Sequence, residues 1–186
     1  MYSKIVRPIL FLLSPEKIHC LVVNCIKVGF RIPGVKWIIK KTTQINHPTL
    51  QRNVFGLNFK NPVGFAAGFD KNAEVFEDFD AFGFSFIEIG TVTPKPQAGN
   101  PKPRSFRLKA DKALINRMGF NNKGVEYAAN KLKKRKGNVI IGGNIGKNTL
   151  TPNELAVNDY LYCFKELYDY VDYLVVNISC PNVANL

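Results

Sequence analysis

The chain has 186 residues, 46% of them hydrophobic and 22% charged, which indicates a globular protein with a real core and excludes a disordered chain. The formal net charge is +12, and residues 1–44 hold eight Lys or Arg against a single acid, Glu16. Four cysteines without a C-x-x-C pair, together with two histidines, argue against a metal site or a disulfide framework. Free thiols suit a reducing cytosol, and no apolar run reaches the length of a membrane-spanning helix.

The basic leading segment is predicted to form two or three short amphipathic helices. Residues 5–13 repeat apolar side chains at helical spacing, Ser14-Pro15-Glu16 is typical of the start of a second helix that ends near Gly29, and residues 35–41 can form a third. These helices are compatible with an anchor at an anionic membrane surface and equally with a helical cap packed on the rest of the chain. We expect no nucleic-acid binding, because no aromatic-basic recognition motif is present.

The composition changes near residue 45, and from there the pattern predicts a mixed α/β domain that begins with a small hairpin at residues 54–59. Apolar strands then alternate with helices, with the strands at residues 62–67, 85–89, 139–144 and 173–178 and the helices at residues 72–82, 122–136 and 154–171. This alternation is typical of a parallel sheet with right-handed crossovers. It predicts the first four units of a (β/α)8 TIM barrel over residues 45–186, after a helical domain at residues 1–44. Because half a barrel leaves an unpaired strand edge, we expect the sequence to be incomplete or to need a second segment.

Polar or glycine-rich sequence follows each predicted strand, and four asparagines lie in these segments: Asn116, Asn144, Asn177 and Asn182. A carboxamide both donates and accepts, so a group of them can bind a ring whose edge alternates N–H and C=O. Neither glycine-rich segment matches the dinucleotide fingerprint or the P-loop. The flat ligand of this edge is therefore expected to be a flavin rather than a nicotinamide.

Cys180 lies where the last predicted strand leaves the sheet, because Pro181 cannot continue the hydrogen-bond ladder. In a parallel barrel this edge carries the active site, which makes the thiol a candidate catalytic group. A small buried cysteine beside a turn is the structural alternative.

Together these segments resemble the dihydroorotate dehydrogenase family. The motifs that carry the resemblance are residues 66–71, 88–94, 115–122, 144–148 and 177–182. Residues 14–19 and 102–107 resemble the membrane-associated, quinone-dependent class of that family. The resemblance runs from the first residues to the last.

The resemblance implies an FMN-binding barrel that oxidises dihydroorotate to orotate in pyrimidine (UMP) synthesis and passes the electrons to a membrane quinone. It places these residues at the FMN: Ala67, Gly68, Phe69, Asp70, Lys71, Thr91, Asn144 and Asn177. It places these at the substrate: Lys71, Asn116, Arg117, Met118, Gly119, Phe120, Asn177 and Asn182. Cys180 takes the position of the catalytic base, and Lys71 is also assigned to catalysis. His19 and Arg107 match polar positions near the quinone tunnel. The implied location is the cytoplasmic side of the cell membrane, held there by residues 1–44.

Two features depart from the family pattern. The quinone-dependent class usually has serine as the base, whereas this chain has Cys180, as in the soluble class. Contacts of the later barrel strands with the flavin phosphate have no counterpart here, so this chain alone is expected to bind FMN poorly. Two alternatives therefore remain: a soluble-type enzyme that uses fumarate or NAD, and a non-catalytic basic module that binds membranes or nucleic acid.

Overall fold

The computed structural model describes residues 2–182, and a four-stranded parallel sheet forms its centre. The strands follow the order β3 (Gly64–Phe65), β4 (Phe86–Val92), β7 (Ile140–Ile145) and β8 (Tyr173–Val176). Each strand runs parallel to its neighbour. The four predicted strands and their parallel pairing are therefore confirmed, although β3 is only two residues long.

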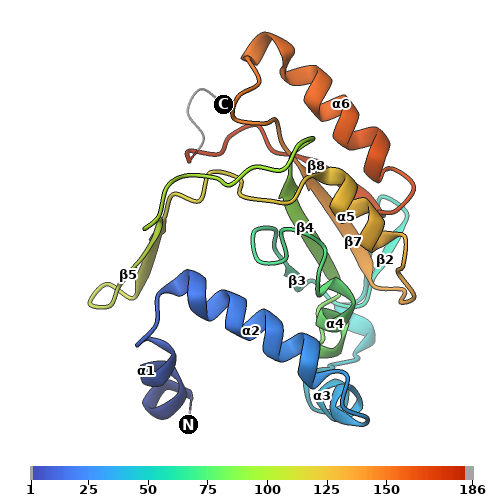
Figure 1. The fold of residues 1–186 in the computed structure, drawn as a ribbon. Helices are drawn as coiled ribbons and strands as arrows, with labels where there is room; N and C mark the ends of the chain where they lie inside the picture. The colour runs from blue at the N-terminus through green and yellow to red at the C-terminus, as the bar shows by residue number, and fades with distance from the viewer. Residues whose placement is uncertain (1, 183–186) are drawn as a thin grey trace.

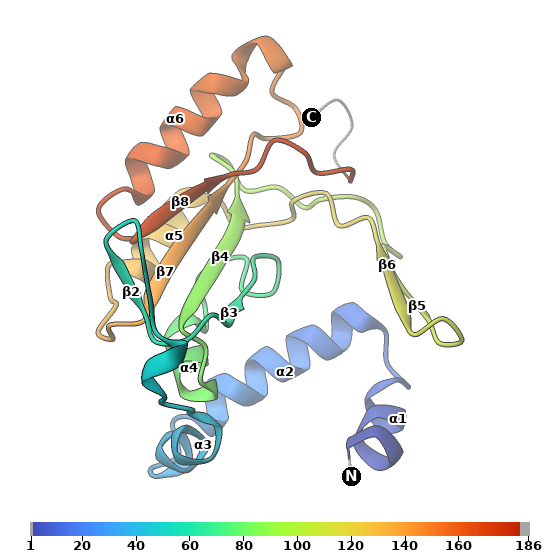
Figure 2. The same ribbon diagram turned by 180° about the vertical axis from the view of Figure 1, so that it is seen from behind.

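Helices α5 (Val125–Leu132) and α6 (Ala156–Leu167) lie side by side on one face of the sheet, as Figures 1 and 2 show. Strand residues that point toward these helices are fully buried, among them Ile87, Ile89 and Ile141. Alternation along each strand directs the intervening residues to the opposite face. The hydrophobic effect thus fixes which set of side chains faces away from the helices.

The predicted helix at residues 72–82 is wrong over its first part. The structure has only α4 (Phe76–Phe79) and the 3-10 turn η3 (Asp80–Phe82) there. Ala73 has a φ of +53°, which is incompatible with a right-handed helix. The other two predicted helices are shorter than expected, since α5 starts after Gly124, whose φ is +86°, and α6 follows the 3-10 turn η4 (Asn153–Leu155).

An antiparallel hairpin interrupts the alternation between β4 and α5. It consists of β5 (Ser105–Leu108) and β6 (Ala113–Asn116), and it extends from the sheet toward the first turn of α2 (Figure 2). The sequence pattern predicted no strands between residues 89 and 122. A second hairpin, β1 (Arg52–Val54) with β2 (Leu57–Phe59), follows the 3-10 turn η2 (Pro48–Leu50) and confirms the one predicted at residues 54–59.

The leading helices are η1 (Tyr2–Val6, a π-helix), α1 (Arg7–Leu10), α2 (Pro15–Gly29) and α3 (Val35–Thr43). Ser14 precedes α2 with an extended backbone, but its side chain makes no capping hydrogen bond, so that part of the predicted helix start is wrong. Among the described residues no single helix is long and apolar enough to cross a membrane. Ser3–Leu10 and Pro15–Gly29, bent by 111°, pass that test only as a pair.

Ion pairs hold α2 and α3 against the rest of the chain. Lys27 pairs with Glu74, and Lys36 lies 3.4 Å from Asp78. The side chains of Val23 and Ile26, on α2, pack against the main hydrophobic core. One side of α2 is therefore already covered by protein.

Candidate active site

Three polar side chains join the carboxyl ends of β4, β7 and β8. Thr91, in β4, donates its hydroxyl proton to Asn144 Oδ1, in β7, at 2.6 Å. Asn177, directly after β8, donates from Nδ2 to Thr91 Oγ1 at 3.2 Å. The carboxyl ends of parallel strands meet at one edge, where α/β enzymes bind their ligands. The structure thus brings together three of the residues that the resemblance assigns to a flavin.

The loop after β3 reaches the same edge through its backbone. The N–H of Gly68 donates to the carbonyl of Gly90 at 2.8 Å, which brings the segment that begins at Ala67 beside the end of β4. A Cβ added at Gly68 would meet nothing within 4 Å, so the space beside this loop is open. A Cβ added at Gly90 would lie 2.3 Å from the carbonyl oxygen of Asn144. Glycine at position 90 therefore allows the close approach of β4 and β7, and the open backbone at Gly68 suits a flat ligand.

Phe69 and Asp70 direct their side chains into the protein rather than toward open space. The Phe69 ring packs edge-on against Phe65, with ring centroids 5.1 Å apart. The buried Asp70 carboxylate accepts hydrogen bonds from the backbone N–H groups of Glu74 and Val75 at 2.7 and 2.8 Å. Burial raises the pKa of Asp70 above its ordinary value, and the two hydrogen bonds oppose this shift only in part. Only the backbone of Phe69 and Asp70 remains for contact with a ligand.

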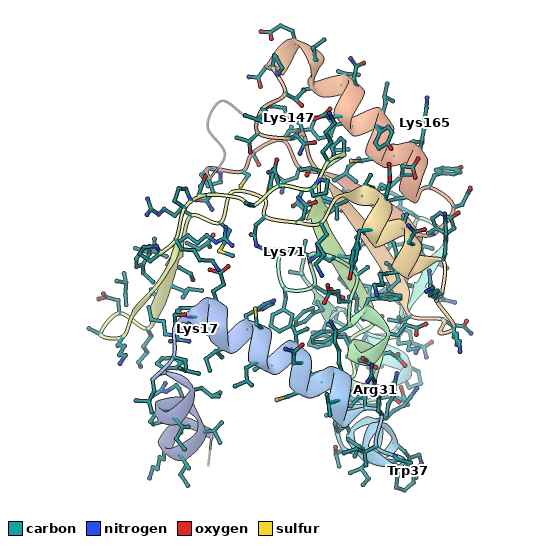
Figure 3. The ribbon with its side chains drawn as sticks, in the orientation of Figure 1. Lys17, Arg31, Trp37, Lys71, Lys147 and Lys165 are labelled. Carbon is teal, nitrogen blue, oxygen red and sulfur yellow. The ribbon has the colours of Figure 1, made fainter. Side chains whose placement is uncertain are left out.

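Lys71 follows in the same loop and is half-buried; Figure 3 labels it between α2 and the sheet. Its Nζ donates to Asn121 Oδ1 at 2.5 Å. Burial lowers the pKa of Lys71 to about 8, and the positive charge of Arg104 acts in the same direction. A cation that is this incompletely solvated gains more than a surface lysine by binding an anion.

The loop after β8 connects the candidate base to two of the predicted substrate asparagines. Cys180 is half-buried and close enough to Lys71 that charge on its sulfur raises the pKa of the lysine. Asn182 donates from Nδ2 to Asn116 Oδ1 at 3.1 Å, and its carbonyl accepts from Asn100 Nδ2 at 3.0 Å. Asn116 stands at the end of β6, 66 residues away along the chain. The two asparagines are thus held together, and they connect the end of β6 to the loop that carries Cys180.

Residues 117–119 follow β6 and contact mainly residues 100 and 103, which precede β5. The guanidinium of Arg117 donates twice to the carbonyl of Pro103, at 3.0 and 3.2 Å. The carbonyl of Met118 accepts from the N–H of Asn100 at 3.1 Å, and Gly119 has a φ of +68°. The structure therefore does not bring the Arg117 side chain into the group of amides.

Phe120 lies against that group. A Cβ added at Gly146 would lie 3.0 Å from the Phe120 ring and 2.9 Å from the Thr91 methyl group, so ring and methyl share one small space. Phe120 is buried. It provides an apolar wall beside the polar ends of β4 and β7.

The two residues predicted for the quinone lie on different elements, His19 on α2 and Arg107 on β5. The His19 ring packs edge-on against Phe69, with centroids 4.4 Å apart, and burial lowers its pKa. Arg107, on β5, donates to the carbonyl of Leu13 at 2.6 Å, and its guanidinium lies 4.3 Å from the centre of the Phe11 ring. Neither contact tests the quinone role itself.

Two charged residues that the sequence left unassigned also contact this site. Glu88 accepts a hydrogen bond from Asn144 Nδ2 at 2.8 Å. Arg104 is buried and pairs with Glu16 on α2. Glu88 is the only charged residue in the apolar strand β4, a signal that could have identified it. The partner of Arg104 had no local signal, because it lies 88 residues away.

The arrangement can bind and react with a flat, anionic ring compound. The carboxamides offer donors and acceptors without net charge, and Lys71 offers a cation for a carboxylate. The thiol of Cys180 can take up a proton once it is ionised. Proton transfer beside a ring held by neutral amides is the chemistry that this set of side chains supports.

Comparisons with known proteins agree with that chemistry. The family model for dihydroorotate dehydrogenase matches residues 49–186. A Christiangramia forsetii protein named dihydroorotate dehydrogenase (quinone) is 57% identical over 186 residues, which cover 100% of this chain and 54% of the relative. A Coxiella burnetii protein of the same name is 52% identical over 186 residues, with 100% and 52% covered.

Solved structures give the same result. A crystal structure of DHODH from Eimeria tenella in complex with ferulenol has a TM-score of 0.75 at 40% identity, covering 92% of this chain and 46% of that one. The ligand-free form from the same organism has a TM-score of 0.78 at 41% identity, with 91% and 47% covered. The mixed α/β structure fits a TIM-barrel family, and the chain spans about half the length of the curated relatives it matches. On this evidence the chain belongs to the dihydroorotate dehydrogenase family.

Proposed function

We propose that the full-length protein is an FMN-dependent dihydroorotate dehydrogenase that oxidises (S)-dihydroorotate to orotate and transfers the electrons to a quinone, a step of de novo UMP synthesis. One observation carries the proposal: Thr91, Asn144 and Asn177 meet in one hydrogen-bonded group at the start of the Cys180 loop, and the carbonyl of Asp70, next to Lys71, accepts from the N–H of Gly90, next to Thr91. The names of the relatives, which specify a quinone, support the choice of acceptor.

The residues present fit a flavin at this edge. The backbone at Gly68 borders open space. The hydroxyl of Thr91, on β4, and the buried amide of Asn144, on β7, lie at the same edge. A flavin ring carries alternating donors and acceptors, which matches carboxamides better than charged groups. Ala67, Gly68, Thr91, Asn144 and Asn177 would hold it.

The mechanism follows from the positions of Cys180 and Lys71. Sγ of Cys180, as the thiolate, takes the proton from the ring carbon next to the C4 carbonyl of dihydroorotate. Bound FMN would supply the acceptor for the hydride that leaves the neighbouring carbon, so that a C=C bond forms between the two carbons. Lys71 binds the substrate carboxylate, while Asn116 and Asn182 orient the pyrimidine ring. Holding the base and the ring in one geometry accounts for much of the rate.

The test is the colour of the purified full-length protein. We expect a yellow preparation that dihydroorotate bleaches and that a soluble quinone re-oxidises. Re-oxidation by fumarate or NAD but not by quinone would support the soluble-type alternative, which the cysteine at position 180 favours. A colourless protein that neither binds added FMN nor oxidises dihydroorotate would contradict both.

We further propose that residues 45–186 form the first four units of a TIM barrel and that residues 1–44 place the protein on the cytoplasmic face of the cell membrane as a peripheral protein. Large apolar side chains within residues 1–44 are exposed in the same segment as the basic residues, which supports this placement; Figure 3 labels Trp37 among them. These side chains are Ile9, Leu12, Leu21, Val28, Trp37 and Ile38. Exposed apolar groups beside Lys and Arg suit the surface of an anionic bilayer.

Co-sedimentation with vesicles tests the membrane proposal. The full-length protein should bind phosphatidylglycerol-containing vesicles more strongly than pure phosphatidylcholine, and Leu12→Asp should weaken that binding. Leu150→Asp is the matched control, because Leu150 is 95% and Leu12 83% exposed, and Leu150 lies outside residues 1–44. Equal loss of binding in both variants would contradict the proposal.

A further inference from the structure

Glu88 is a carboxylate on the face of the sheet opposite the helices. In β4 its neighbours Ile87 and Ile89 point toward the helices and are fully buried. Glu88 therefore points the other way, where Oε1 accepts from Asn144 Nδ2 at 2.8 Å and Oε2 accepts from the Tyr173 hydroxyl at 3.4 Å. The catalytic mechanism above does not use this carboxylate.

The strand register builds the contact between Glu88 and Tyr173. Glu88 pairs with Gly142, and Gly142 pairs with Tyr173, so all three lie in one row across the sheet. A Cβ added at Gly142 would lie 2.3 Å from the tyrosine ring, which shows that the ring crosses the position left empty by this glycine. Burial raises the pKa of Tyr173, and the negative charge of Glu88 raises it further, so the hydroxyl keeps its proton and donates it.

The hydrogen bonds that continue from Glu88 have a defined direction. An ionised carboxylate only accepts, so Asn144 must turn its NH2 group toward Glu88 and its oxygen toward Thr91. The Thr91 hydroxyl then donates to Asn144 and accepts from Asn177 Nδ2. What remains of the Asn177 side chain toward a ligand is the second N–H of Nδ2 and the oxygen Oδ1, and among the described residues this oxygen accepts only a long hydrogen bond of 3.5 Å from the Ser179 N–H.

We propose that Glu88 is a positioning residue that sets the donor and acceptor direction of the Asn144–Thr91–Asn177 chain and thereby presents Asn177 to the ring ligand as an acceptor. The inference rests on the proposed function, because it takes the ligand to be FMN or the pyrimidine substrate. Glu88 touches neither in this scheme and acts only through Asn144.

A neutral amide at position 88 would reverse the chain. In Glu88→Gln the Tyr173 hydroxyl donates to the amide oxygen, so the NH2 group faces Asn144. Asn144 then turns its oxygen to that group and its NH2 to Thr91, which donates in turn to the oxygen of Asn177. Asn177 would offer the ring an N–H instead of a C=O. A mismatched, desolvated polar pair of this kind weakens binding about tenfold or more.

The experiment uses the full-length protein with bound FMN removed and restored. FMN affinity is measured by quenching of flavin fluorescence in the apoprotein, and the steady-state kcat and KM for dihydroorotate are measured in the holoenzyme. Glu88→Gln should raise the FMN Kd or the KM about tenfold while kcat falls less. Glu126→Gln is the matched control, because Glu126 also accepts from a tyrosine hydroxyl, that of Tyr162, but lies on α5.

Two further variants distinguish direction-setting from packing. Thr91→Val cuts the chain, so adding Glu88→Gln to it should change the KM by less than about twofold. Tyr173→Phe leaves the bond between Glu88 and Asn144 intact and should leave both constants within about twofold of the unsubstituted protein. Tyr173→Phe still tests the inference if Glu88→Gln does not fold, since a packing role of the Glu88–Tyr173 contact predicts that Tyr173→Phe is harmful.

Three results would overturn the inference while leaving the proposed function intact: wild-type constants in Glu88→Gln, an equal effect of Glu88→Gln with and without Thr91→Val, or a tenfold loss in Tyr173→Phe. A protein that binds no FMN and does not oxidise dihydroorotate in its unsubstituted form would instead overturn the proposed function, and this inference with it.

Discussion

Arg104 and Glu16 form a two-point ion pair between residues 88 positions apart, with Nη2 to Oε1 at 2.5 Å and Nε to Oε2 at 3.3 Å. Arg104 also donates to the carbonyls of Ala98 and Asn100, at 2.6 and 3.0 Å. The side chain of Asn100 in turn donates to the carbonyl of Asn182. The first turn of α2 is thus connected through one arginine to the loop that carries the candidate base.

Removing the arginine should destabilise this connection strongly. Arg104 is 7% exposed, and breaking a buried ion pair by deleting one partner costs about 3 kcal/mol because it leaves a charge without its partner. We expect Arg104→Ala to lower the free energy of unfolding by about that amount in urea titrations. Lys102→Ala is the control, since Lys102 is exposed and lies 3.6 Å from the same carboxylate; its loss should cost less than about 1 kcal/mol. Equal losses of unfolding free energy in the two variants would contradict the assignment of Arg104 as the main partner of Glu16.

The same pair predicts a pH dependence. The hydrogen bond from Arg104 lowers the pKa of Glu16 below its ordinary value. A carboxyl group with a depressed pKa contributes stability above its unfolded pKa, about 4.3, and loses it as the pH falls through the folded value. The difference in unfolding free energy between Glu16→Gln and the unsubstituted protein should therefore be large at pH 7 and shrink in acid. A difference that does not change with pH would count against this.

Lys71 should be neutral in a larger fraction of molecules than any surface lysine at mildly alkaline pH. Burial lowers its pKa to about 8, against about 10.4 for a free lysine. Acylation of Lys71 in the ligand-free protein, followed by mass spectrometry, should rise through pH 8; the exposed Lys165, which Figure 3 labels on α6, is the comparison in the same sample. An anionic substrate should suppress the reaction. Parallel profiles for both lysines would refute the prediction.

Cys180→Ser should make turnover more dependent on alkaline pH. Thiols ionise near pH 8.5, whereas hydroxyl groups ionise far higher, so the thiol needs less help to act as a base near neutrality. We expect kcat of the serine variant to fall at least tenfold at pH 7 and to recover in part as the pH rises. Superimposable kcat–pH curves for the two proteins would rule out a base at residue 180.

Gly90→Ala should disrupt the packing of β4 against β7 at the candidate site, whereas Gly29→Ala should leave the site unchanged. At position 90 the added Cβ meets the backbone of Asn144 at 2.3 Å and φ is +102°; at position 29 nothing lies within 4 Å. We expect Gly90→Ala to cost about 3 kcal/mol or more of unfolding free energy and to abolish FMN binding. Gly29→Ala, at the end of α2, should be neutral or up to about 1 kcal/mol more stable. Thermal unfolding of both variants is the measurement.

The parallel strands, the β1–β2 hairpin and α2 could be predicted because their signals are local. Apolar runs such as residues 139–144 bury both faces of a strand, and the fixed φ of Pro15 suits the first position of a helix. The residues at the strand ends could also be identified, since polar sequence after a buried strand lies at one known edge of a parallel sheet.

Contacts of individual side chains and the register of the strands decided the rest. The helix expected at residues 72–82 lost its first part because the Asp70 carboxylate binds the N–H groups of Glu74 and Val75, a bond that no periodicity reveals. The direction of the hydrogen bonds from Glu88 to Asn177 depends on three strands whose order and register exist only after folding. Sequence patterns determine which groups reach the edge, whereas hydrogen-bond geometry across the sheet determines which group donates to which.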